Sequence, residues 1–120
     1  AKQPFMSDLL DMLLQAGYQV ILTSDHGNIQ ASGCGRPAEG ALAVTRGERV
    51  RIFRDIALRD RVATDFPQAI AWSGTGLPES VFPLLAPHRQ AFVSESKQLV
   101  CHGGISLEEI VVPLVQIERK

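Results

Sequence analysis

The 120-residue sequence lacks several features that would assign a protein to a narrow class. It has no apolar run that approaches the roughly 20 residues a membrane-spanning helix needs, and its N-terminus lacks the layout of a signal peptide. Its two cysteines, Cys34 and Cys101, lie far apart and form no CxxC pair. This spacing argues against a structural zinc ribbon and against a disulfide-dense secreted scaffold. We therefore expect a cytoplasmic protein with reduced thiols and no membrane partner.

An excess of charge of either sign is also lacking. Twelve Lys and Arg residues against thirteen Asp and Glu residues leave a formal net charge of −1, so nothing global indicates binding to nucleic acid or to an anionic membrane. The composition is that of an ordinary globular domain, with 45% hydrophobic residues, in a chain long enough to bury a core. Because the chain opens without an initiator Met, we interpret residues 1–120 as one piece of a longer protein.

The apolar pattern predicts a helix followed by a buried strand. Leucines and methionines recur at helical spacing over residues 6–14, and Gly17 is suited to ending that helix. Residues 18–23 form an almost unbroken apolar run, as expected of a strand covered on both faces in a parallel sheet. The chain closes with an apolar strand over residues 110–117. We therefore expect an α/β fold with a mainly buried sheet flanked by helices.

The middle of the chain is harder to interpret. Residues 28–40 are rich in Gly, Ser, Ala and Pro, which predicts a long loop, and a short strand is expected at 41–44. Residues 49–54 alternate like a half-exposed strand with Val50 and Ile52 turned inward. On this interpretation four arginines cover a solvated strand face, where charge discourages edge-to-edge association. Contact with nucleic acid through this stripe is the alternative. The four are Arg46, Arg49, Arg51 and Arg54.

Two groups of polar residues follow apolar segments and could hold a metal ion. Asp25 and His26 come directly after the predicted strand, where ligands gather in open α/β sheets, and Gly27 lets the backbone bend. His102 likewise follows an apolar segment and precedes Gly103. A carboxylate with imidazoles suits Zn²⁺ or Mn²⁺. We expect the two histidines to approach each other and to share a metal site with Asp25; a turn cap at Asp25 and a merely polar loop residue at His26 form the alternative.

Other candidate residues have competing structural explanations. Arg36 follows a glycine-rich stretch and is a candidate phosphate contact, although a flexible surface loop is the alternative. Ser106 and Glu109 have the spacing of a capping box, with a general acid at Glu109 as the alternative. Cys101 is expected to be a small buried residue rather than a metal ligand. His88 is expected to be exposed in a turn.

Both metal-ligand motifs resemble those of a known family. Residues 24–28, Ser-Asp-His-Gly-Asn, resemble the Ser-Asp-His-Gly motif of the alkaline-phosphatase superfamily of phosphatases, sulfatases, phosphodiesterases and cofactor-independent phosphoglycerate mutases. Residues 102–113, His-Gly-Gly-Ile-Ser-Leu-Glu-Glu-Ile-Val-Val-Pro, resemble the C-terminal signature of the PglZ family of bacterial BREX phage-defence systems. Residues 46–53 and 72–78 are similar to the same family, so the resemblance covers most of the chain.

The resemblance implies a two-metal phosphohydrolase. In such enzymes Asp25 and His26 would hold one divalent ion, and His102 would hold the other. Zn²⁺ or Mn²⁺ would suit, and two ions about 4 Å apart can clamp a phosphoryl oxygen. The family's nucleophile and its Asp-x-x-x-His element have no counterpart in this sequence and are expected before residue 1.

The resemblance also sets expectations for the whole chain. Residues 1–120 would be the C-terminal portion of a PglZ, alkaline-phosphatase-like domain that acts on a phosphoester in antiviral defence, with other BREX proteins as partners. Without the upstream nucleophile, the isolated chain is expected to be inactive. The alternative is a catalytically degenerate scaffold within a defence complex.

Overall fold

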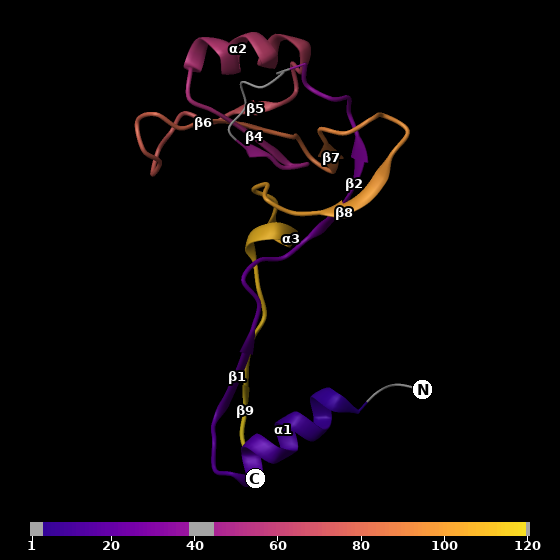
Figure 1. The fold of residues 1–120 in the computed structure, drawn as a ribbon, viewed down its shortest axis with the longest axis vertical. Coiled ribbons are helices and arrows are strands. Elements are labelled where there is room, and N and C mark those ends of the chain that lie inside the picture. The colour runs from indigo at the N-terminus through magenta and orange to yellow at the C-terminus, as the bar shows by residue number, and fades with distance from the viewer. Residues whose placement is uncertain (1–3, 39–44, 120) are drawn as a thin grey trace. The chain divides into compact units, whose positions relative to one another are not determined.

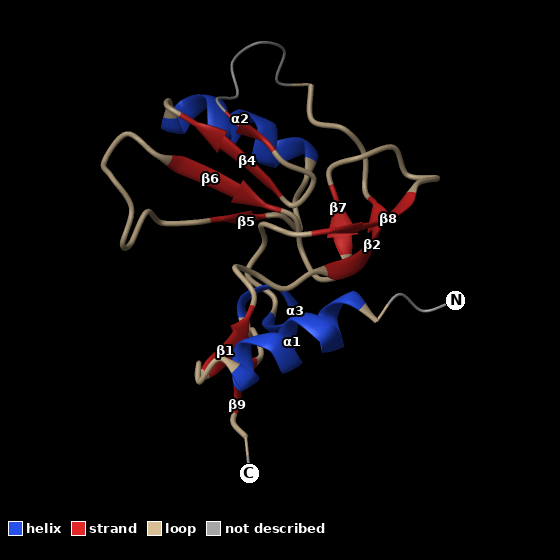
Figure 2. Cartoon of the chain, turned by 60° about the horizontal axis from the view of Figure 1, so that its bottom comes forward, coloured by secondary structure: helices blue, strands red, loops and turns tan. Residues whose placement is uncertain are grey.

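The computed structural model describes residues 4–38 and 45–119, which form two compact units (Figure 1). One unit comprises Ala1–Asp25 and Val112–Lys120, and the other comprises His26–Val111. Helices and strands mix along the chain, which confirms the expected α/β class (Figure 2). No helix within the described ranges has the length and apolarity that crossing a membrane requires.

The first unit contains one helix and a two-stranded ribbon. The helix α1 (Phe5–Gln15) ends as expected near Gly17, whose φ of +84° favours glycine. The strand β1 (Val20–Thr23) pairs antiparallel with β9 (Leu114–Ile117). Both strands were expected, but the pairing is antiparallel and not parallel.

The ribbon is also more exposed than its apolar sequence suggested. Ile21 is 60% exposed and Leu114 is 78% exposed, and no residue of α1 is buried. The expectation of a strand covered on both faces is therefore wrong within this unit. The physical reason is that two strands alone form no second layer, so neither face of the ribbon is enclosed.

The second unit contains a four-stranded antiparallel sheet with the helix α2 (Ile56–Asp65) against it (Figure 2). Phe53 and Leu84 of the sheet are buried together with Val62 of α2 in the main core of this unit. Asp55 begins the helix because its carboxylate accepts hydrogen bonds from the amides of Ala57 and Leu58. In sheet order the strands are β3 (Thr45–Arg46), β4 (Val50–Phe53), β6 (Phe82–Leu85) and β5 (Ile70–Ala71).

A three-stranded sheet lies where part of a long loop was expected. The strand β2 (Ile29–Gly33) pairs antiparallel with β8 (Gln98–Cys101) and parallel with β7 (Gln90–Ala91). The small residues of β2 resemble a loop composition, but the strand needs them. A Cβ at Gly33 would lie 2.0 Å from the carbonyl oxygen of Ser94. The strand predicted at residues 41–44 lies outside the described residues.

The side chains of β4 alternate in the opposite sense to the expected one, with the arginines inside. Arg49 and Arg51 are buried, and Val50 and Ile52 are only half-buried. The guanidinium of Arg51 donates to the carbonyl oxygen of Phe92 over 3.0 Å and to that of Gly47. The expectation of a solvated arginine stripe is therefore wrong for these two residues, and with it the surface on which nucleic-acid contact depended. Arg54 is exposed, and the side chain of Arg46 lies outside the described part of the structure.

Candidate functional site

His26 and His102 lie side by side in the second unit. The register of β2 and β8 explains this, because Ile29 at the start of β2 is opposite Cys101 at the end of β8. His26 precedes the first strand by a short segment, and His102 follows the second directly. The ring centroids are 3.8 Å apart and the planes differ by 17°, so the imidazoles are stacked. The expected approach is confirmed, although it results from an antiparallel pair rather than from the ends of parallel strands.

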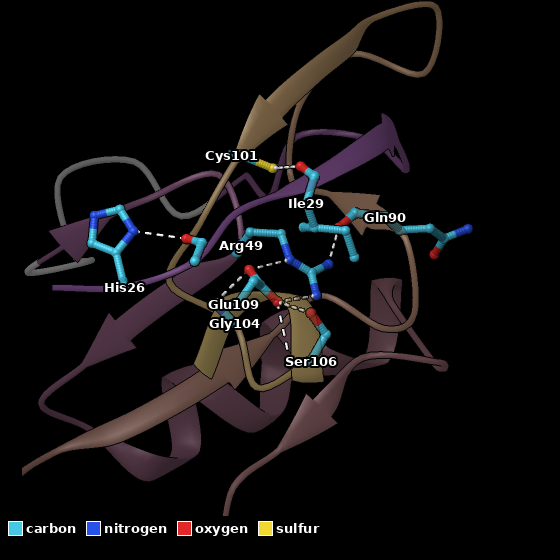
Figure 3. A network of polar contacts seen from close by, with 9 residues as sticks. His26, Ile29, Arg49, Gln90, Cys101, Gly104, Ser106 and Glu109 are labelled. Atoms are coloured by element: carbon cyan, nitrogen blue, oxygen red, sulfur yellow. Dashed lines mark hydrogen bonds and ion pairs between the residues drawn. The ribbon is translucent and has the colours of Figure 1, made fainter. Parts of the chain in front are cut away.

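A hydrogen bond sets the tautomer of His26 (Figure 3). Its Nδ1 lies 2.7 Å from the carbonyl oxygen of Gly27. Because a carbonyl oxygen only accepts hydrogen bonds, the proton is on Nδ1 and the ring's lone pair is on Nε2. Histidines that ligate metals commonly donate their other ring N–H to a backbone carbonyl in this way. Both histidines are exposed, so an ion or a substrate can reach them.

Figure 3 shows a buried ion pair between Arg49 and Glu109, whose carboxylate also contacts Gly104 and Ser106. Glu109 belongs to the short helix α3 (Leu107–Ile110) and is 3% exposed. Its two carboxylate oxygens accept from Nε and Nη2 of Arg49 over 2.9 and 3.0 Å. The carboxylate also accepts from the amides of Gly104 over 2.9 Å and of Ser106 over 3.2 Å. The expected return of Glu109 to the amide of Ser106 is thus confirmed.

The environment of Glu109 argues against the alternative of a general acid. Burial opposes its ionisation, but the hydrogen bonds from Arg49, Gly104 and Ser106 outweigh burial and lower the pKa to about 2. At neutral pH the side chain is therefore an ionised, enclosed acceptor with no proton to give. The ion pair could not be predicted from the sequence, since its two members are 60 residues apart.

The chain matches one known protein family. The family model of the BREX system PglZ alkaline phosphatase-like domain matches residues 2–117 of the chain. The chain belongs to this PglZ family. No curated protein matches the chain. The description of this family as alkaline phosphatase-like agrees with the superfamily that the resemblance of the two motifs implied.

His26 and His102 have side chains of a type that binds metal ions, but two ligands are too few to hold an ion. Imidazole nitrogen suits Zn²⁺ and Mn²⁺. Within residues 4–38 and 45–119, however, no group of three or more His, Cys, Asp and Glu side chains lies close enough to hold an ion. Metal ligation by His26 and His102 therefore stays a prediction, and on that prediction further ligands would be needed to complete the site.

The remaining predicted PglZ site residues are placed as follows. Asp25 is exposed and is the last residue of the first unit, directly before His26. Its role as a ligand stays a prediction. Arg36 is exposed and follows the far end of β2. Because five strand residues span about 13 Å, Arg36 lies at the opposite end of β2 from the histidines, and its placement lends no support to a phosphate contact there.

Two residues that were expected to be structural are structural in the second unit. Cys101 is buried, and burial raises the pKa of its thiol, which disfavours the thiolate that a metal ligand needs. His88 is exposed in a turn with a φ of 41°. Neither residue changes the assignment of the site to the stacked histidines.

Proposed function

We propose that residues 1–120 supply part of the metal site of a metal-dependent phosphohydrolase that acts in bacterial phage defence with other BREX proteins. The observation that carries this proposal is the stacking of His26 and His102 at 3.8 Å. Family membership supports the phosphohydrolase class and the BREX context. The substrate would be a phosphomonoester or phosphodiester.

The chain's own residues would bind the ions and orient them. His26 would bind an ion through Nε2, because its Nδ1–H is held by the carbonyl oxygen of Gly27. Asp25 would serve the same ion as His26, and His102 the second ion. Bound divalent ions supply Lewis-acid polarisation of a phosphoryl oxygen. The nucleophile would come from residues before this chain, so residues 1–120 alone are expected to be inactive.

The test is made on the full-length protein that contains these residues. We expect His26→Ala and His102→Ala each to lose bound Mn²⁺ or Zn²⁺ and to lower hydrolysis of p-nitrophenyl phosphate or bis(p-nitrophenyl) phosphate at least about 100-fold, since even residues that only support a ligand cost 10–100-fold. His88→Asn is the matched control, because His88 is exposed and its φ of 41° suits asparagine. It should leave metal content and hydrolysis unchanged.

Two outcomes would contradict the proposal. Wild-type metal content in both histidine variants would show that the ligands are wrongly assigned. A wild-type protein that takes up no divalent ion and hydrolyses neither ester would instead support the scaffold alternative. Chelation with EDTA followed by return of the ion separates a metal requirement from general damage, because only a metal enzyme regains activity.

A further inference from the structure

The two turns that carry the histidines converge on one residue, Glu109. The side chain of Glu109 accepts from the amide of Gly104, two residues after His102, over 2.9 Å. The main-chain carbonyl of Glu109 accepts from the amide of Gly27, directly after His26, over 2.8 Å. One residue of α3 therefore holds the backbone on the C-terminal side of both histidines.

Close packing makes this connection stiff. A Cβ at Gly27 would lie 2.0 Å from the carbonyl oxygen of Glu108, and a Cβ at Gly104 would lie 2.5 Å from Oε2 of Glu109. At Gly27 the close atom is backbone, so glycine is needed there; a side chain at Gly104 would have to displace the Glu109 and Arg49 side chains. Both histidine turns thus lie directly against α3 or against the side chain that extends from it.

Arg49 connects this assembly to the sheets of the second unit. Its guanidinium donates to both oxygens of Glu109 and to the carbonyl oxygen of Gln90 in β7, the neighbour of β2. Its own carbonyl oxygen accepts from the amide of Ala86 over 2.9 Å, just after β6. The position of Glu109 is therefore set by both sheets, through a two-point contact that lysine cannot make.

We infer that the Arg49–Glu109 pair is a positioning device that sets the separation and orientation of His26 and His102. The expected effect on metal affinity rests on the proposed function, whereas the effect on the placement of the two rings does not. Neither residue is placed on an ion or on a substrate, so both are positioning residues.

An ionised glutamate is better suited to this place than an apolar residue would be. Replacing a buried ion pair by apolar residues of similar volume is often neutral or stabilising, so stability alone does not require the pair. The amides of Gly104 and Ser106, however, need an acceptor when they are enclosed. Two carboxylate oxygens can accept from both amides and from Arg49 together. A glutamine has one acceptor oxygen, so it cannot accept from Arg49, from both amides and from the hydroxyl of Ser106 together.

The matched control is the neighbouring glutamate. Glu108 also pairs with an arginine, Arg89, but both of these side chains are exposed to solvent. The exposed pair holds no amide of either histidine turn among the hydrogen bonds described. Glu108→Gln therefore removes a glutamate–arginine pair from the same helix without touching the proposed device.

The experiment compares Glu109→Gln, Arg49→Lys and Glu108→Gln in the full-length protein, with two readouts. The first is affinity for Mn²⁺ or Zn²⁺ by calorimetry, expected to fall about 10–100-fold in the first two variants and to be unchanged in the third. The second is the proton–proton nuclear Overhauser effect between the rings of His26 and His102 in the metal-free protein with labelled histidine. It should be present in wild type and Glu108→Gln and lost or weakened in the other two.

The two readouts separate this inference from the proposed function. If Glu109→Gln and Arg49→Lys keep both wild-type affinity and the ring-to-ring signal, the positioning role is overturned, while loss of metal in His26→Ala still supports the function. If wild type binds no ion, the function fails, and the ring-to-ring signal alone decides the positioning role. Arg49→Lys keeps the charge on both partners, so it provides the test if Glu109→Gln does not fold. A variant that keeps its secondary structure and loses affinity is the expected result.

Discussion

The two compact units of this chain contain similar apolar residues but bury them very differently. In His26–Val111, Phe53 and Leu84 are fully enclosed between α2 and the four-stranded sheet. In the other unit, α1 has a clear apolar face yet buries no residue, and the ribbon leaves Ile21 60% exposed. The comparison teaches that periodicity identifies the face that can be buried. A second layer of structure decides whether that face is buried.

The site belongs to the unit that has the core. His26, His102 and the Arg49–Glu109 pair all lie within His26–Val111. A rigid second unit can therefore hold the imidazole pair in place, whereas local opening is expected to concentrate in the segments with few buried contacts. Three predictions break or sharpen this contrast.

The largest expected effect comes from the core of the second unit. Phe53→Ala should destabilise the chain by about 3–5 kcal/mol, because it removes a fully buried ring and leaves a cavity. Ile21→Ala, at an exposed position of β1, should cost less than about 1 kcal/mol. Urea unfolding followed by the fluorescence of Trp72, the one tryptophan of the chain, measures the first loss directly.

Circular dichroism in the same titration reports on both units and serves as the control for Ile21→Ala. Equal losses in the two variants would contradict the contrast, since they would show that the ribbon is enclosed to the same degree as the core.

Local patterns in the sequence predicted much of the secondary structure. Three features were predicted from residues close together in the chain. They are the helix that ends near Gly17, the two strands of the ribbon and the hydrogen bond from the amide of Ser106 to Glu109. The approach of His26 to His102 was also predicted, but from parallel strand ends. It arises instead because β2 and β8 are antiparallel partners.

The errors have a common cause in contacts between distant residues. Charged residues of a strand usually face solvent. On that rule the arginines of β4 were predicted to be exposed, but Arg49 and Arg51 are buried. Arg49 can be buried only because Glu109, 60 residues later, supplies a carboxylate. Likewise the loop predicted over residues 28–40 is wrong at β2, where the glycine allows the strand to pack closely against residue 94. No local pattern carries that information.

The second prediction concerns acid stability of the second unit. The folded-state pKa of Glu109 is about 2, below its ordinary value of 4.5. Ionised Glu109 therefore stabilises the fold above pH 4.5, and this contribution is lost as the pH falls from 4.5 towards 2. The loss amounts to about 3 kcal/mol once the pH is below about 2, and about 2 kcal/mol of it is expected by pH 3. Urea unfolding at pH 7, 4.5 and 3 should show it in wild type and show less of it in Glu109→Gln.

Glu108→Gln provides the comparison for the acid experiment, because Glu108 is an exposed glutamate of the same helix. It should keep the acid dependence of wild type. An acid dependence in Glu109→Gln as steep as that of wild type would place the critical carboxylates elsewhere and remove Glu109 from the explanation.

The smallest expected effect distinguishes the two long helices at their first turns. Asp55 caps α2 by accepting from the amides of Ala57 and Leu58, whereas the N-cap residue of α1, Pro4, provides no side-chain hydrogen bond. Asp55→Ala should therefore cost about 1 kcal/mol and speed hydrogen exchange at the amides of Ala57 and Leu58.

Ser7→Ala, in the first turn of α1, should change the free energy of unfolding by less than about 0.5 kcal/mol, since the exposed hydroxyl of Ser7 contacts only the carbonyl oxygen of Pro4 among the bonds described. A loss at Ser7 as large as that at Asp55 would mean that α1 is held as firmly as α2, and the contrast between the units would not extend to their helices.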